Sequence, residues 1–246
     1  MNFSSCDISN ICPKYIEADT PLWKFKQNIN DLEILKTDKY TFSAQYQQDP
    51  SPSGGGMFKD EYWRYYDNNN FNISEVDLIR IYGDTAQKTA EHNDFSVFQC
   101  WARIPNKGVF LLDQIRGKWE APELESKLVE FWDKHKRTQF KAKGAQIVKI
   151  EDKSSGSSLI QSIRTNYMIP VEGIQRSKDK VVRAMGTVAY FNNGKVFLPR
   201  EKEPWLEDYK DEFRKFTPLM THKHDDQIDP TMDAVEDLLV FDQMIY

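Results

Sequence analysis

Short stretches in which apolar and polar residues alternate predict four β-strands in the region that follows residue 75. The stretch "VDLIRIYGD" (76–84) is typical of a buried strand, and it ends at an acid. The stretches "DFSVFQCWARI" (94–104) and "GVFLLDQIRG" (108–117) are separated by the turn residues "PNK", which predicts a hairpin. The stretch "AQIVKIED" (145–152) predicts a further strand that again ends at acids.

Helical periodicity appears between and after these strands. In "APELESKLVEFWDKHKR" (121–137), Leu124, Leu128, Phe131 and Trp132 share one face, and Pro122 suits the first turn. The element order β-β-β-α-β-α predicts an α/β fold, with a mixed central sheet flanked by helices. Further helices are predicted in 154–165, in 178–199 (ending in a short strand), in 205–216 and in 224–244, where Pro230 must lie in the first turn.

Composition is that of a globular protein. The chain has 246 residues, of which 39% are hydrophobic, enough for one sizeable core. It has neither an apolar run long enough for a membrane span nor a signal-peptide pattern, which predicts an intracellular protein. Three cysteines (Cys6, Cys12 and Cys100) form no CxxC pair and do not indicate a disulfide framework. The stretch "QQDPSPSGGGMF" (47–58) is typical of a linker.

The net charge of −5 argues mildly against a protein that binds nucleic acid mainly through charge. The charges are unevenly placed, however, because residues 176–200 contain a single acid, Asp179. A local basic surface is therefore compatible with an acidic chain. The basic residues of this segment are Arg176, Lys178, Lys180, Arg183, Lys195 and Arg200.

Acidic residues lie at the ends of three predicted elements, and the folded sheet would place these ends close together. Two groups end predicted strands, and the third lies at or near the start of the last helix. Loops at the carboxyl edge of a sheet commonly form sites, and clustered carboxylates repel one another unless a hard cation such as Mg²⁺ or Mn²⁺ binds them. The candidate metal ligands are Asp84, Glu151, Asp152, Asp225, Asp226 and Asp229.

Each acid also has a structural interpretation. An Asp at a strand end is commonly a turn residue, and the "ED" at 151–152 could cap the following helix. Asp229 before Pro230 could be an ordinary N-cap. The run 225–237 could be a solvated face, and we expect Asp233, Glu236 and Asp237 to face water.

Five ordered motifs resemble those of one family. They are "FSAQYQQDPSPSGGGMFKDEYW", "GDTAQKTAEHNDFSV", "IEDKSSGSSLIQSI", "KDKVVRAMGTVAYFNNGKVFLP" and "HDDQIDPTMDAV". In this order they resemble the C-terminal nuclease domain of the large terminase subunit of tailed bacteriophages, over about residues 42–239. The resemblance implies an RNase H-like fold for residues 58–246, with residues 1–57 as the tail of an ATPase domain and a linker.

The resemblance also implies an activity, the endonucleolytic cutting of concatemeric double-stranded DNA during viral genome packaging with two Mg²⁺ or Mn²⁺ ions. Carried over by position, Asp84 is the first catalytic ligand, Glu151 or its neighbour Asp152 is the second, and the third comes from Asp225, Asp226 or Asp229. Of these three, Asp226 is taken as the third catalytic residue. The accessory candidates are Asp94 for the metal and Lys88, Lys180, Arg183 and Lys195 for DNA.

The resemblance implies further partners and one departure. The partners are a terminase ATPase domain, the small terminase subunit and the portal protein, in the cytoplasm of a bacterial host and away from membranes. The departure is the absence of a G-x-x-x-x-G-K-[ST] motif, so we expect no ATPase activity from this chain. The alternatives are another RNase H-like nuclease of the resolvase type, a small-molecule metal phosphoesterase, and an inactive prophage-remnant module that binds DNA or docks onto a partner.

Overall fold

The computed structural model describes residues 56–67, 69–86, 95–137, 143–200, 203–218 and 225–240. A seven-stranded sheet in the order β1-β7-β4-β3-β2-β5-β6 forms its centre. Strand β3 is antiparallel to both of its neighbours, and the remaining pairs are parallel, so the sheet is mixed. The strands are β1 (Arg64–Tyr66), β2 (Leu78–Asp84), β3 (Ser96–Ile104), β4 (Gly108–Gly117), β5 (Ile147–Glu151), β6 (Val171–Ile174) and β7 (Val196–Pro199).

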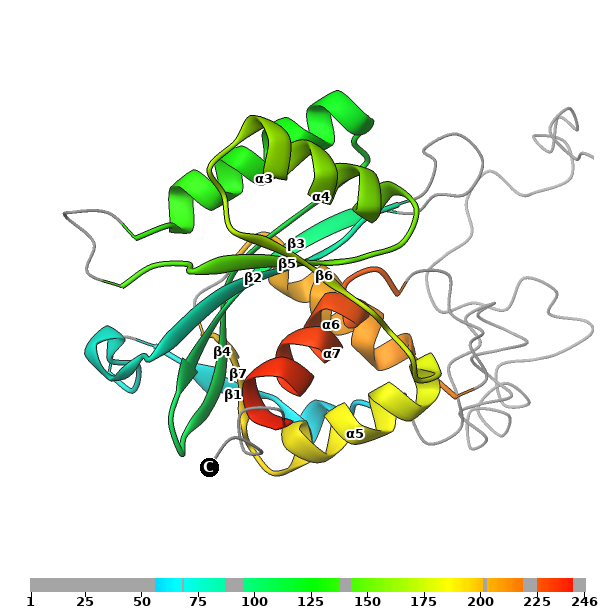
Figure 1. Cartoon of the computed structure of the whole chain (residues 1–246). Coiled ribbons are helices and arrows are strands. Elements are labelled where there is room, and N and C mark those ends of the chain that lie inside the picture. Colours follow the sequence, from blue (N-terminus) through cyan, green and yellow to red (C-terminus); the bar gives the residue numbers. More distant parts are fainter. Residues whose placement is uncertain are drawn as a thin grey trace, which may run out of the picture. The chain divides into compact units, whose positions relative to one another are not determined.

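Helices cover both faces of this sheet (Figure 1). Helices α3 (Ala121–His135) and α4 (Ser155–Asn166) lie together on one face. On the other face lie α5 (Lys180–Asn192), α6 (Leu206–Lys215) and α7 (Ile228–Val235), and α7 continues into the π-helical turn η5 (Glu236–Val240). Short 3-10 helices η3 (Asp60–Tyr62) and η4 (Ile73–Glu75) flank β1.

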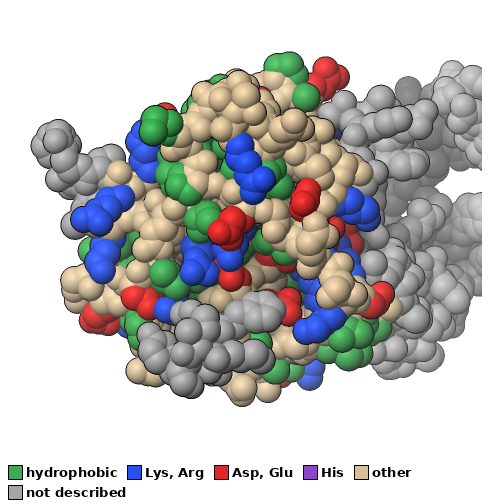
Figure 2. Space-filling model, viewed as in Figure 1, with side chains coloured by type: hydrophobic (Ala, Val, Ile, Leu, Met, Phe, Trp, Pro, Cys, Tyr) green, Lys and Arg blue, Asp and Glu red, His purple; other side chains and the backbone are tan. Residues whose placement is uncertain are grey.

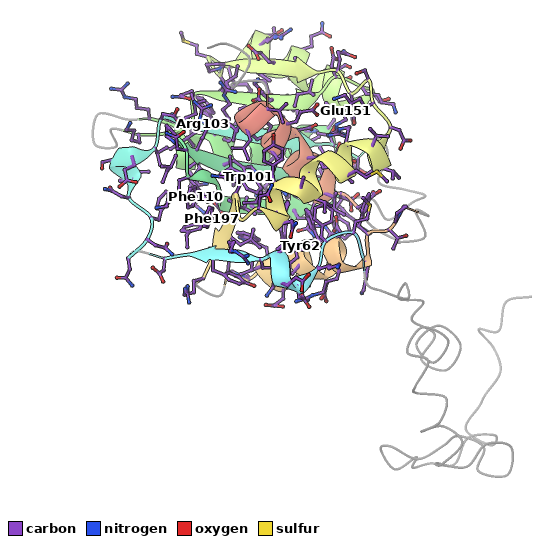
Figure 3. All side chains as sticks on the ribbon, turned by 90° about the horizontal axis from the view of Figure 1, so that it is seen from below. Tyr62, Trp101, Arg103, Phe110, Glu151 and Phe197 are labelled. Carbon is purple, nitrogen blue, oxygen red and sulfur yellow. The ribbon has the colours of Figure 1, made fainter. Side chains whose placement is uncertain are left out.

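Alternation along the strands produces two cores, one on each face of the sheet. In β2, Ile79 and Ile81 point into the core beneath α3 and α4, whereas Tyr82 points into the core beneath α5, α6 and α7. Phe110 of β4 and Phe197 of β7 stack with ring centroids 4.6 Å apart, and Figure 3 shows the two rings next to each other. Burial on both faces explains why the central strands are rich in large apolar residues.

The structure confirms the predicted α/β fold, the hairpin of β3 and β4, and the helices α3, α4, α5, α6 and α7. Pro230 lies in the first turn of α7, as predicted. The pattern missed β1 and β6, which are short strands at the two edges of the sheet. Most of the predicted tail and linker (1–57) lies outside the described residues. Among those described, no helix is both long and hydrophobic enough to cross a lipid bilayer.

Candidate active site

The predicted acids Asp84 and Glu151 meet at one edge of the sheet. Strands β2 and β5 are parallel neighbours, with Gly83 opposite Ile150, so their carboxyl ends lie side by side. In Figure 3, Glu151 and Arg103 of β3 lie toward opposite ends of the strands. The Asp84 and Glu151 side chains are 19% and 24% exposed, which leaves both accessible from solvent.

Arg176 lies between these acids. It follows β6, and its Nη1 atom is 2.8 Å from Glu151 Oε2 and 3.3 Å from Asp84 Oδ1. The same nitrogen is 3.7 Å from Asp229 Oδ1, while Nη2 donates to Asp233 Oδ2 at 2.7 Å. The guanidinium therefore joins the ends of two strands to helix α7.

Helix α7 brings its acids to the sheet edge in a defined register. It begins at Ile228, before Pro230, and Asp229 and Asp233 lie one turn apart on the same face. Arg183 of α5 binds both of them, with Nη1 2.6 Å from Asp229 Oδ1 and Nη2 bound to Asp233 Oδ1. Lys180 Nζ lies 2.5 Å from Oδ2 of Asp225 and 2.5 Å from Oδ2 of Asp229.

A fully buried glutamine, Gln227, fixes the start of α7. Its side chain accepts from Gln114 Nε2 at 2.6 Å and donates to Glu212 Oε2 at 2.7 Å. Its backbone N–H donates to Glu212 Oε1 at 2.6 Å, and its carbonyl accepts from Gln99 Nε2 at 2.9 Å. These bonds tie the helix start to β3, β4 and α6, which positions Asp229 two residues later.

The cluster carries more negative than positive charge. Its four carboxylates, on Asp84, Glu151, Asp229 and Asp233, face the three cations Arg176, Lys180 and Arg183, and Asp225 adds a fifth carboxylate through its contact with Lys180. When all five are ionised, two negative charges remain uncompensated. Burial raises the pKa of Asp84 to about 7, with Asp229 and Glu151 adding to the rise and Arg176 opposing it. Burial also raises the pKa of Asp233. For Asp229, burial acts upward, but Arg176, Lys180 and Arg183 outweigh it and hold the pKa below its ordinary value.

The other predicted acids lie apart from this centre. Asp226, proposed for the catalytic set, pairs with Arg116 Nη2 at 3.2 Å, beside Glu212. Asp225 contacts the cluster through Lys180. Asp152 is exposed and accepts hydrogen bonds from Ser157 Oγ at 2.6 Å and Gln175 Nε2 at 3.1 Å.

The predicted DNA-binding residues are divided between two places. Lys180 and Arg183 are engaged with the acids, and Arg183 is buried, so its guanidinium is not presented on the surface. Lys195 precedes the amino end of β7, at the end of the sheet away from Asp84, and donates to the Asn106 carbonyl. Asp94 and Lys88 lie outside the described residues.

The expectation that Asp233, Glu236 and Asp237 face water is wrong for the two aspartates. Asp233 is 4% exposed and bonds to both arginines of the cluster. Asp237 accepts from Tyr82 Oη at 2.6 Å and from Arg80 Nη1 at 2.7 Å. Sequence reasoning gave neither Asp233 nor Arg176 a role in the site. The spacing of Asp229 and Asp233, four residues apart in a helix, was the available signal.

The donor chemistry at this edge fits a divalent cation. Asp84, Glu151 and Asp229 offer only carboxylate oxygens, which Mg²⁺ and Mn²⁺ prefer, and the uncompensated negative charge favours such ions. In the part of the chain that the structure describes, no three acidic, His or Cys side chains already surround one point as metal ligands. Arg176 and Lys180 stand between the carboxylates instead.

Comparison with known proteins places the chain in a family. The Terminase RNaseH-like domain family matches residues 81–238. The large terminase from a thermophilic bacteriophage, in complex with ADP, is 13% identical, with a TM-score of 0.51 over 69% of this chain and 44% of that one. The large terminase nuclease from thermophilic phage G20c with bound magnesium is 14% identical, with a TM-score of 0.53 over 75% of this chain and 98% of that one.

These likenesses establish the fold, which is RNase H-like. The chain spans less than half the length of the ADP-bound large terminase that it matches. No curated protein sequence gives a significant match. The family match covers well over half of the chain and includes Asp84, Glu151 and Asp229. The chain therefore belongs to the Terminase RNaseH-like domain family.

Proposed function

We propose that this chain is a metal-dependent DNA endonuclease, the nuclease domain of a large terminase subunit. The observation that carries the proposal is the convergence of Asp84, Glu151 and Asp229 at the carboxyl edge of an RNase H-like sheet. The magnesium named for the G20c nuclease supports a divalent cation as the cofactor. The proposed substrate is concatemeric double-stranded DNA, cut during viral genome packaging.

Asp84, Glu151 and Asp229 would hold the metal, and Asp229 replaces Asp226 as the proposed third carboxylate. Two Mg²⁺ or Mn²⁺ ions, when bound, would lower the pKa of water and neutralise charge on the phosphodiester. The chain's own task is to keep the carboxylates ionised and in register. Asp84, with a pKa of about 7, must lose its proton to act as a ligand. Strand β5 holds Glu151 in place, and the first turn of α7 holds Asp229.

The proposed partners follow from the family and not from a surface of this chain. Acidic and basic side chains are intermixed on the face viewed in Figure 2. Double-stranded DNA, an ATPase domain, the small terminase subunit and the portal protein are the partners that we propose, in the cytoplasm of a bacterial host. No ATPase activity is proposed for this chain, because it has no phosphate-binding loop motif.

Nicking of supercoiled plasmid in Mn²⁺ tests this function. We expect the wild-type protein to convert supercoiled plasmid to the nicked and linear forms, and EDTA to stop the reaction. Asp84→Ala should lose the activity while its circular dichroism spectrum stays that of the wild type. Asp152→Ala is the matched control, because this exposed acid lies outside the cluster and should be dispensable. A folded Asp84→Ala protein that cuts at the wild-type rate would refute the proposal.

A further inference from the structure

The cation at the centre of the site comes from the protein itself. The Arg176 side chain is 9% exposed, and Nη1 lies within 3.7 Å of carboxylate oxygens of Asp84, Glu151 and Asp229. These are the three side chains to which the proposed function assigns the metal. A guanidinium is always charged at physiological pH, so its attraction for these acids is permanent.

The two ends of the guanidinium have different partners. Nη1 faces the three proposed ligands, whereas Nη2 and Nε face Asp233, at 2.7 Å and 3.3 Å from its Oδ2. Asp233 is held in turn by Arg183. Arg176 can therefore release the sheet-edge acids and still keep one buried, hydrogen-bonded partner, which avoids the cost of an unpaired buried charge.

We propose that Arg176 is the internal counter-cation of this site, holding Asp84 and Glu151 together in the metal-free protein and competing with divalent cations for them. This inference rests on the proposed function, because it takes Asp84, Glu151 and Asp229 as the ligands. Arg176 is a positioning residue, acting through the carboxylates and not on the substrate. The competition makes the metal affinity weaker than that of the same carboxylates without the arginine.

The sign of the effect on metal affinity distinguishes this role from a purely structural one. A single charge about 5 Å from a divalent ion changes its binding by a factor of at least about ten, even in a water-like dielectric. Arg176→Gln should therefore bind Mn²⁺ at least about tenfold more tightly than wild type, while its metal-free form melts at a lower temperature. If the arginine only supported the fold, the same variant would bind Mn²⁺ equally well or less well.

Electron paramagnetic resonance measures the concentration of free Mn²⁺ while each protein is titrated, which gives the affinity for the ion. Arg176→Lys keeps the charge and should bind Mn²⁺ within about threefold of wild type, because competition persists. Lys178→Gln is the matched control, since it removes a nearby cation that is 61% exposed and paired with Glu236, outside the cluster. It should leave the affinity unchanged. Arg176→Gln binding no more tightly than wild type would overturn the proposal.

A measurement on the wild-type protein keeps the test decisive if Arg176→Gln does not fold. The Nε–Hε signal of Arg176 in an NMR spectrum, assigned with Arg176→Lys, should shift when diamagnetic Mg²⁺ saturates the site. The chemical shift of the Arg103 signal should not change, because Arg103 is paired with Asp77 at the other end of the strands from Asp84. An unmoved Arg176 signal would also overturn the proposal. Wild-type protein that binds no Mn²⁺ would instead refute the proposed function.

Discussion

The glutamine that fixes the start of α7 offers a direct test of how the fold positions the site. Gln227→Met keeps the length and approximate volume of the side chain but removes its amide. The backbone bonds of residue 227 to Glu212 and Gln99 remain. The substitution therefore removes the side-chain hydrogen bonds with Gln114 and Glu212, and a longer one of 3.5 Å to the Asp208 carbonyl, while it changes the packing little.

The loss of stability comes from the buried polar groups that each lose a hydrogen-bond partner. Gln114 Nε2 loses an acceptor at 2.6 Å inside the core, and Glu212 Oε2 loses a donor at 2.7 Å. An unsatisfied buried polar group costs about 1–3 kcal/mol, and a bond to a charged group contributes about 1.5–3 kcal/mol. We expect the free energy of unfolding to fall by about 2.5–6 kcal/mol, a large part of the about 5–15 kcal/mol typical of a domain.

The loss should depend on pH in a defined direction. Burial raises the pKa of Glu212 above its ordinary 4.5, and the hydrogen bonds from Gln227 oppose that rise. Removal of the side-chain bond raises the folded-state pKa further, so ionised Glu212 costs the fold more as pH rises above about 4.5. The deficit of the Gln227→Met variant should therefore be larger at about pH 8 than at about pH 5.

Urea unfolding followed by tryptophan fluorescence, at both pH values and in EDTA, measures these differences. Gln175→Met is the matched control, because Gln175 is exposed and makes one hydrogen bond, to Asp152. It should unfold within about 0.5 kcal/mol of wild type. A Gln227→Met protein that is as stable as the control would show that these buried bonds do not hold α7 in place.

Three further substitutions test the site and the sheet that carries it. Asp229→Asn should abolish plasmid nicking in Mn²⁺ whereas Asp226→Asn retains it; the reverse result would restore Asp226 as the third carboxylate. Asp84→Asn should gain stability relative to wild type, in EDTA, as pH rises from about 4 to about 7. In that window the folded wild-type protein keeps a proton on Asp84 that the unfolded chain has lost, which lowers its stability by about 1.4 kcal/mol per unit of pKa shift. A constant difference in urea midpoints would contradict this. Gly83→Ala places a Cβ 2.7 Å from the Phe98 ring and should lower the free energy of unfolding by about 1–3 kcal/mol, measured by thermal melting; an unchanged melting temperature would show that the ring can move aside.

The elements that build this site were predictable because their signals are local. Strands β2 and β5 consist mostly of apolar residues, and each ends at an acid. The helix signals at Pro122 and Pro230 arise because the proline ring favours the first turn of a helix. The placement of Asp84 and Glu151 at one sheet edge needed only the assumption that their strands are neighbours. The sequence pattern did not predict strand β6 because the strand is short and its two middle residues, Glu172 and Gly173, are exposed.

The pairing of charges was not predictable, because it depends on contacts between distant segments. Arg176 follows an unpredicted strand, so nothing local indicated that it would meet Asp84 and Glu151. The choice of Asp229 over Asp226 as the proposed ligand depends on where α7 begins, which Gln227 sets through β3, β4 and α6.

The order of the three carboxylates along the chain has a consequence for biosynthesis. Asp84 and Glu151 belong to strands that leave the ribosome early, whereas Asp229 arrives with α7, after every strand of the described sheet. A nascent chain that has assembled the sheet still has no third carboxylate. If the proposed function is correct, host DNA near the translating ribosome would not meet a working nuclease until α7 has docked.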